Sequence, residues 1–227
     1  MSGKTALITG GTKGIGYGIA QALVNEGYKV AITGRDEAAG KKAAGDKMLF
    51  IKSDVRDLKS QQDAVAKTLK EFGSLDVLVA NAGVGAFASI EDMTPEQWNQ
   101  IIDVNLTGVF YSIKASLDAL KKSKGYIITI SSLAGTNFFA GASAYNASKF
   151  GLTGFTQAVM LDLRKYGIKV STIMPGSVAT EFNNHSVGEG DDWKIQIEDL
   201  GQIVVDLLRM HPRTLPSKIE VRPSVPK

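Results

Sequence analysis

The sequence predicts an α/β protein built on a parallel sheet with helices on both faces. Short apolar, β-branched runs alternate with longer stretches of helical periodicity, and this alternation indicates successive strand–helix–strand crossovers. The runs also lack polar alternation, as in Val77-Leu78-Val79 and Ile127-Ile128-Thr129-Ile130. Strands that are covered on both faces have this pattern, so both observations indicate the same architecture.

Each element is predicted from its residues. The residues from Ala64 to Phe72, before Gly73, have the spacing of a helix. Thr94-Pro95-Glu96-Gln97 marks a helix start, with a hydroxyl at the cap, proline at the first helical position and an amide three residues after the cap. Trp98 on this helix is expected in the core. The predicted strands are Thr5–Thr9, Lys29–Thr33, Met48–Lys52, Asp76–Ala80, Gly125–Ser131, Ile168–Met174 and Lys218–Val221.

One long stretch, from Pro175 to Glu198, has no clear period and contains the polar run Gly188–Asp192. Loops of this length inside a compact domain are usually functional or disordered. We interpret residues 177–198 as a mobile substrate lid. A solvated surface excursion is the alternative.

The composition predicts one globular domain over residues 1–227, with 44% hydrophobic and 22% charged residues. The absence of cysteine excludes disulfides and thiolate sites, and two histidines argue against a histidine metal site or a Ser-His-Asp relay. The net charge of +3 is scattered, so no nucleic-acid partner is expected. Neither a membrane span nor a signal peptide is evident, and we expect a cytoplasmic protein.

A glycine-rich loop, Thr9-Gly10-Gly11-Thr12-Lys13-Gly14-Ile15-Gly16, joins the first predicted strand to a helix. Glycine allows close backbone approach, and a helix N-terminus presents free N–H groups to an anion. The strand before and the helix after favour nucleotide binding over a purely structural turn. Lys13 lies in the glycine loop and Arg35 lies at the end of the second strand. Both side chains are cationic and favour a 2′-phosphate, and hence NADP. Asp36 favours NAD instead, because it is placed to accept the ribose 2′-hydroxyl.

Tyr145 and Lys149 are four residues apart, so they share one face of a predicted helix. An ammonium near a phenol stabilises the phenolate by roughly 4 kcal/mol at about 4 Å and an effective dielectric near 20. Ser132 follows the fifth strand and Asn81-Ala82-Gly83 follows the fourth. Both lie at the carboxyl edge of the predicted sheet, where the glycine loop also lies and where ligands bind in open parallel sheets.

These residues, in this order, give the sequence a resemblance to the short-chain dehydrogenase/reductase family over nearly the whole chain. The resemblance implies a doubly wound Rossmann-type domain with seven parallel strands in the order 3-2-1-4-5-6-7. It also implies an NAD(P)-dependent oxidoreductase. The matching elements are Thr9–Gly16, Asp54-Val55, Asn81-Ala82-Gly83, Asn105, Ser132, Tyr145 with Lys149, and Pro175-Gly176 with Thr180.

The resemblance also implies roles for these residues. Tyr145 is the general acid or base, Ser132 holds the substrate oxygen, and Lys149 lowers the pKa of Tyr145 and binds the nicotinamide ribose. Asn105 links Lys149 to solvent through a water. Cofactor contacts are expected from Gly10, Thr12, Lys13, Gly14, Ile15, Gly16, Arg35, Asp54, Val55, Asn81, Ala82, Gly83, Tyr145, Lys149, Pro175, Gly176, Val178 and Thr180.

The expected substrate is a small carbonyl compound or secondary alcohol, contacted by Ser132, Tyr145, Phe138, Phe139 and Phe182. A 3-oxoacyl thioester is the alternative substrate. A non-catalytic NADP-binding regulator is the alternative of a different class, although a regulator has no need of Tyr145 or Ser132.

A homodimer is expected through the helices at Asn105–Lys122 and Tyr145–Lys165, with a homotetramer as the alternative. The chain closes with Ile219–Lys227 and lacks the glycine-rich tail of many relatives. That difference argues against the tetramer more than against the dimer.

Overall fold

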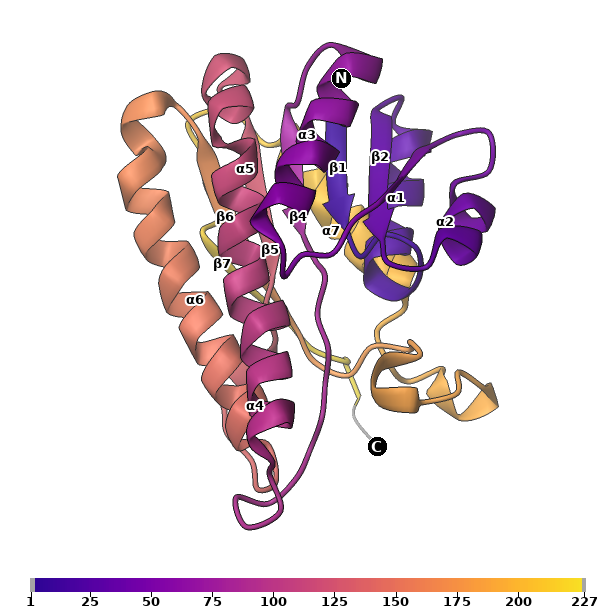
Figure 1. The fold of residues 1–227 in the computed structure, drawn as a ribbon, viewed down its shortest axis with the longest axis vertical. Coiled ribbons are helices and arrows are strands. Elements are labelled where there is room, and N and C mark those ends of the chain that lie inside the picture. Colours follow the sequence, from indigo (N-terminus) through magenta and orange to yellow (C-terminus); the bar gives the residue numbers. More distant parts are fainter. Residues whose placement is uncertain (1–2, 226–227) are drawn as a thin grey trace.

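The computed structural model describes residues 3–225, and its seven strands form one sheet in the order β3-β2-β1-β4-β5-β6-β7 (Figure 1). Every neighbouring pair of strands is parallel, as predicted. The predicted ends of each strand are correct to within one residue. The strands are β1 (Thr5–Thr9), β2 (Lys29–Gly34), β3 (Leu49–Lys52), β4 (Val77–Ala80), β5 (Tyr126–Ile130), β6 (Lys169–Pro175) and β7 (Lys218–Val221).

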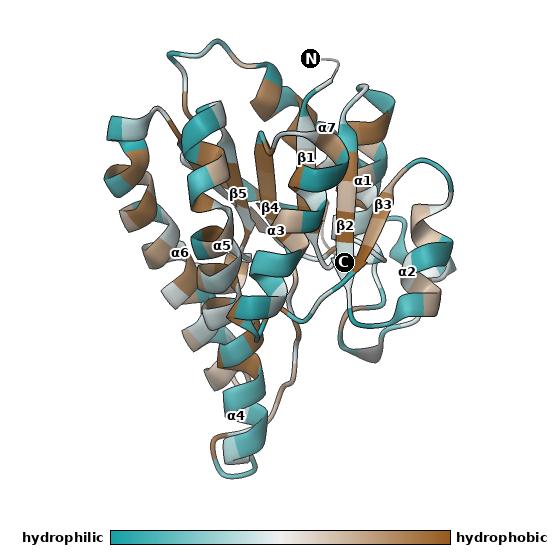
Figure 2. Cartoon of the chain, turned by 45° about the horizontal axis from the view of Figure 1, so that its top comes forward, coloured by the Kyte–Doolittle hydropathy of each residue, from teal (hydrophilic) through white to brown (hydrophobic). Residues whose placement is uncertain are grey.

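Helices cover both faces of the sheet, because side chains alternate along each strand. Ile8 of β1 packs with α1 and α7, whereas its neighbour Leu7 packs with α3, α5 and α6. Apolar residues are concentrated on the strands and hydrophilic ones on the outer parts of the helices (Figure 2). The helices are α1 (Gly14–Asn25), α2 (Glu37–Ala44), α3 (Leu58–Phe72), α4 (Pro95–Ile102), α5 (Gly108–Ser123), α6 (Ser143–Leu163) and α7 (Ile197–Arg209).

The segment predicted as a lid joins β6 to α7 and projects from the body of the protein, in orange in Figure 1. It contains two 3-10 turns, Phe182–Asn184 and Glu189–Asp191. Its base is held by a parallel bridge in which Ala179 N–H donates to the Ile195 carbonyl at 2.9 Å. The segment is therefore folded, although the sequence gives it no period.

Inside this segment Asp191 organises the chain. Its carboxylate accepts a hydrogen bond from Gly188 N–H at 3.2 Å and pairs with His185 and Lys194 at 2.7 and 2.5 Å. The hydrogen bond from Lys194, followed by that from His185, holds the pKa of Asp191 far below its usual range. These contacts brace the outer half of the segment without help from the sheet.

One packing prediction is wrong. Trp98 was expected in the core, but its side chain is exposed. The capping box that starts α4 is present, with Thr94 and Gln97 exchanging both hydrogen bonds. The helix lies beyond the sheet and contacts α6, so one of its faces is not covered by the sheet.

In the described part of the chain no helix is long and apolar enough to cross a bilayer.

Candidate active site

The glycine loop between β1 and α1 is compact because its glycines leave room for the loop after β4. Gly10 has φ +64°, and a Cβ there would lie 2.9 Å from Ala82 Cα. A Cβ on Gly16 would collide with the side-chain amide of Asn81. Substitution at either position would therefore push the glycine loop away from the loop after β4.

Asn81 joins these two loops. Its side-chain amide donates to the carbonyls of Thr9 and Gly10 at 2.9 and 3.1 Å. In return, the Thr9 hydroxyl accepts from Asn81 N–H and Ala82 N–H at 3.0 and 3.1 Å. The resemblance implies a cofactor contact at Asn81, and these four hydrogen bonds hold Asn81 beside the glycine loop.

The N-terminus of α1 suits a phosphate group. The N-cap residue, Lys13, makes no side-chain capping bond, and the first turn contains no acidic residue. The N–H groups of this turn and the helix dipole thus favour an anion. A Cβ on Gly14, which has φ +55°, would lie 3.5 Å from Thr180 Cγ2. Thr180 of the β6–α7 segment therefore lies close to the loop, and the uncapped N-terminus of α1 fits the phosphates of a dinucleotide.

Three charged residues that are expected near the cofactor differ in how they are held. Arg35 is exposed at the end of β2, while Asp36 caps α2 by accepting from Ala39 N–H at 3.0 Å. Asp54 pairs with Arg56 at 2.6 Å, and the hydrogen bond from this guanidinium lowers the pKa of Asp54. Asp54 is thus ionised near neutral pH, and both of its oxygens accept hydrogen bonds from Arg56.

The four residues assigned to catalysis come from three neighbouring parts of the fold. Tyr145 and Lys149 lie on α6, and Ser132 follows β5. Asn105 lies in a π-helical turn, Asp103–Thr107, before α5, and such turns occur often at functional sites. Its side chain accepts from Val84 N–H at 2.8 Å and donates to the Val84 carbonyl at 2.9 Å. Asn105 therefore fixes the loop that follows β4.

Lys149 is buried at the centre of this group. Its Nζ donates to the Ile130 carbonyl at 3.0 Å and lies 5.7 Å from the centroid of the Tyr145 ring. A Cβ on Gly83 would be 3.7 Å from the same Nζ. Burial lowers the pKa of Lys149 to about 8, because an ammonium out of water is costly.

Tyr145 differs from the expectation in one respect. The sequence predicts that Lys149 lowers the pKa of Tyr145, but in the structure that pKa is raised. Burial of the phenol is the main cause, and the hydrogen bond with the Ser132 side chain opposes it. The difference arises because burial also disfavours the charge on Lys149, whose Nζ is directed to the Ile130 carbonyl.

Three phenylalanine rings form an aromatic wall beside Tyr145. The rings of Phe87 and Phe182 lie 5.4 and 5.8 Å from the Tyr145 ring, and Phe139 lies 5.9 Å from Phe87. Each of the three side chains is partly open to solvent. A Cβ on Gly85 would lie 2.5 Å from the Phe182 ring, so this glycine makes room for it.

The remaining predicted contact residues differ in whether the structure fixes them near the site. Gly176 N–H donates to the Val221 carbonyl of β7 at 2.8 Å, which fixes the start of the β6–α7 segment after Pro175. Val178 forms the bridge at the base of that segment. Phe138 is 84% exposed, and its contact with substrate stays a prediction.

Sequence reasoning missed Phe87 and Glu181. Phe87 lies in a loop without periodicity, and Glu181 is one of many acidic residues in a polar stretch. Their positions in the sequence are the only available signal. Phe87 follows shortly after Asn81-Ala82-Gly83, and Glu181 directly follows Thr180.

The family model of the short chain dehydrogenases matches residues 4–189, which include both the glycine loop and the Tyr145–Lys149 pair. The chain belongs to the short chain dehydrogenase family. This short chain dehydrogenase is 32% identical over 232 residues to an uncharacterized oxidoreductase of Staphylococcus saprophyticus, with 97% of each chain covered.

Solved structures agree with this membership. An alcohol dehydrogenase from Thermococcus sibiricus, complexed with 5-hydroxy-NADP, has a TM-score of 0.92 at 27% identity, covering 99% of this chain and 98% of that one. A 3-ketoacyl-(acyl-carrier-protein) reductase from Brucella melitensis, complexed with NADH, has a TM-score of 0.90 at 26% identity, covering 98% of both chains. The short chain dehydrogenase is therefore a hydride-transferring oxidoreductase that acts on CH–OH or carbonyl groups with a nicotinamide cofactor.

The buried lysine predicts a pH-dependent stability. Between pH 8 and 10.5 the unfolded chain holds a proton on residue 149 that the folded chain has released, so folding becomes more favourable as pH rises. Relative to Lys149→Met, the unfolding free energy of the natural protein should rise by about 3 kcal/mol across this window. Urea unfolding at a series of pH values measures this difference. Lys67→Met, at an exposed position of α3, is the control, and a pH-independent difference for Lys149→Met would contradict the assignment.

Proposed function

We propose that this enzyme reduces neutral carbonyl compounds to secondary alcohols with NADPH, and catalyses the reverse oxidation. One observation carries the proposal: the buried Tyr145 lies beside Ser132 and Lys149 at the edge of the sheet that holds the glycine loop. When bound, the nicotinamide supplies or accepts the hydride. The chain supplies the proton and the position of the substrate oxygen.

In the reductive direction Tyr145 donates its proton to the oxygen that gains negative charge as the carbonyl carbon is reduced. Its raised pKa keeps the phenol protonated near neutral pH, which is the state that this step requires. Ser132 donates a second hydrogen bond to the same oxygen. The Ser132 hydroxyl is held between Ala134 N–H at 3.1 Å and the Pro175 carbonyl at 3.5 Å, and the long second contact is readily exchanged for substrate.

The oxidative direction needs Tyr145 as a base. Lys149 assists here only in its charged form, because an ammonium stabilises phenolate whereas a neutral amine does not. Loss of that charge near pH 8 sets an upper limit on the assistance. Near neutral pH the phenol of Tyr145 is protonated, which is the state that reduction requires, whereas oxidation requires its proton to leave first.

The preference for NADP rests on charge and on how the two candidate residues are used. Lys13 and Arg35 are cationic and exposed near the glycine loop. Asp36, the residue that argues for NAD, accepts a hydrogen bond from the first turn of α2. A bound NADP analogue in one structural neighbour and NADH in the other show that both cofactors occur on this fold. The charges of this chain favour NADP.

The substrate class is inferred from the aromatic wall of Phe87, Phe139 and Phe182. Aromatic rings favour flat apolar groups, and we infer a neutral ketone or aldehyde with an apolar substituent. A 3-oxoacyl thioester is the second candidate, because one structural neighbour is a 3-ketoacyl reductase. A non-catalytic regulator fits less well, since it has no use for Tyr145, Ser132 and Lys149 together. The cytoplasmic location stays a prediction.

Tyr145→Phe tests the proposed chemistry. Without the phenolic proton, ketone reduction should fall by about 10²- to 10⁴-fold. NADPH binding, measured by nicotinamide fluorescence, should stay within about twofold, because aromatic packing is kept. Tyr126→Phe is the matched control, since this buried tyrosine bonds Ser171 within the sheet. Near-normal turnover by Tyr145→Phe would refute the assignment.

The aromatic wall predicts a substrate preference. In Phe87→Leu and Phe182→Leu, kcat/KM for acetophenone should fall about 3- to 10-fold relative to kcat/KM for 2-butanone, because each ring contact with a flat substrate is lost. Tyr166→Leu is the control, since this exposed aromatic residue follows the end of α6, far along the helix from Tyr145. An equal loss for both ketones would mean that the rings act only on stability or on catalysis.

We propose that the enzyme is a homodimer through α5 and α6. Phe110 and Phe150 are 44% and 42% exposed, Leu161 is 59% exposed, and the Phe110 ring lies 6.3 Å from that of Phe155 across the two helices. Light scattering should give twice the mass of the 24.2 kDa chain, and Leu161→Glu should give monomers. Ile90→Glu, in an exposed loop, is the control. A monomer at micromolar concentration would overturn the proposal.

A further inference from the structure

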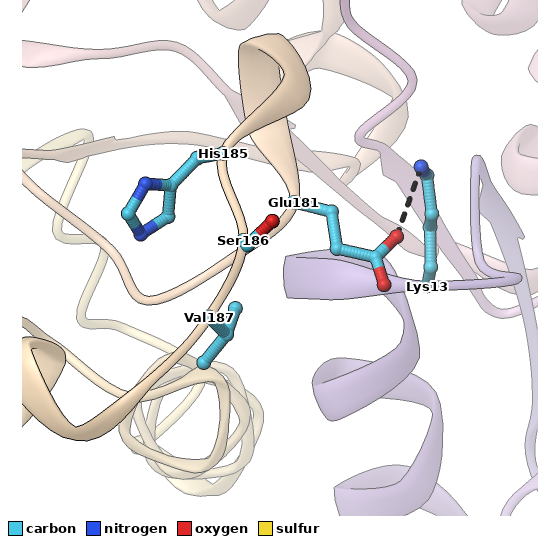
Figure 3. Close-up of a pocket in the computed structure, with 5 residues that line it drawn as sticks. All are labelled: Lys13, Glu181, His185, Ser186 and Val187. Atoms are coloured by element: carbon cyan, nitrogen blue, oxygen red, sulfur yellow. Dashed lines mark hydrogen bonds and ion pairs between the residues drawn. The ribbon is translucent and has the colours of Figure 1, made fainter.

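Lys13 of the glycine loop forms an ion pair with Glu181 of the β6–α7 segment. The Nζ–Oε2 distance is 3.2 Å, although the residues are 168 apart in sequence. The two side chains extend toward one another from separate segments (Figure 3). They are 69% and 65% exposed, so water competes for both groups and the pair exchanges partners readily.

The pair borders a surface cavity of about 510 Å³. His185, Ser186 and Val187 complete its lining, and all three belong to the β6–α7 segment (Figure 3). The cavity therefore lies between that segment and the N-terminus of α1, where backbone N–H groups favour an anion. A phosphate that enters from this side meets the Lys13 ammonium already paired with a carboxylate.

We propose that Glu181 is a specificity-determining residue that competes with the 2′-phosphate of NADP for Lys13. This inference rests on the proposed use of NADP and of Lys13 as a phosphate ligand. The phosphate carries a charge of about −1.5 to −2 near neutral pH, so it displaces the singly charged carboxylate. The displaced Glu181 stays close and repels it, which lowers the affinity for NADPH. NADH has no 2′-phosphate and is insensitive to the exchange.

The rest of the segment does not depend on this ion pair. Asp191, His185 and Lys194 hold its outer half together, and the bridge between Val178 and Ile195 holds its base. Removal of the Glu181 charge therefore leaves the segment folded. Thr180, the neighbour of Glu181, also keeps its hydroxyl contact with Phe182 N–H at 3.3 Å.

The test is a set of binding titrations. NADPH and NADH are titrated against the natural protein, Glu181→Gln, Lys13→Met and the double variant, and nicotinamide fluorescence gives Kd. Glu181→Gln should bind NADPH about 3- to 10-fold more tightly and NADH unchanged. This gain should vanish in the Lys13→Met background and shrink at high salt, because it is electrostatic. Glu189→Gln, an exposed acidic position of the same segment, is the control.

Two failures are distinguishable. If Lys13→Met weakens NADPH binding by tenfold or more while Glu181→Gln changes nothing, the role of Glu181 is overturned and the use of NADP stands. If Lys13→Met leaves NADPH binding intact, the 2′-phosphate does not bind Lys13. In that case the role of Glu181 falls together with the placement of NADP on which it rests.

Discussion

The hydrogen bonds between Asn81 and the Thr9–Gly10 backbone are the interaction on which the site depends. They join the glycine loop to the loop that leads to Phe87, across two strands that are neighbours in the sheet. Because the strands are parallel, their carboxyl ends meet at one edge. Without this link the glycine loop would lack its fixed distance from Lys149 and Tyr145.

Burial shifts the pKa values of two side chains at this edge of the sheet. The same desolvation that raises the pKa of Tyr145 lowers that of Lys149, so both groups are driven toward their neutral forms. A neutral phenol beside the Ser132 hydroxyl is an acid ready to protonate a developing alkoxide. The charge of Lys149 becomes more important when Tyr145 must act as a base, because an ammonium stabilises the phenolate.

The β6–α7 segment connects the two halves of the site. Glu181 reaches the glycine loop, while Phe182, the next residue, packs beside Tyr145. Contacts to the cofactor side and to the substrate side therefore come from adjacent residues. In the function proposed above, this short segment contributes to both cofactor choice and substrate fit, whereas the sheet below it positions the loops.

The sequence by itself determined the seven strands, their parallel arrangement and the positions of Ser132, Tyr145 and Lys149. These features depend on local signals: unbroken apolar runs, a glycine loop before a helix, and a spacing of four residues on one helical face. The fold was therefore predictable to within a residue at each strand end.

Tertiary structure alone decided the rest. Trp98 is exposed because its helix extends past the sheet, the pKa of Tyr145 is raised because burial outweighs the hydrogen bond with Ser132, and Lys13 pairs with Glu181. The aromatic wall likewise combines Phe87, Phe139 and Phe182 from three separate loops. Burial and contacts between distant residues have no period in the sequence, so only the folded chain reveals them.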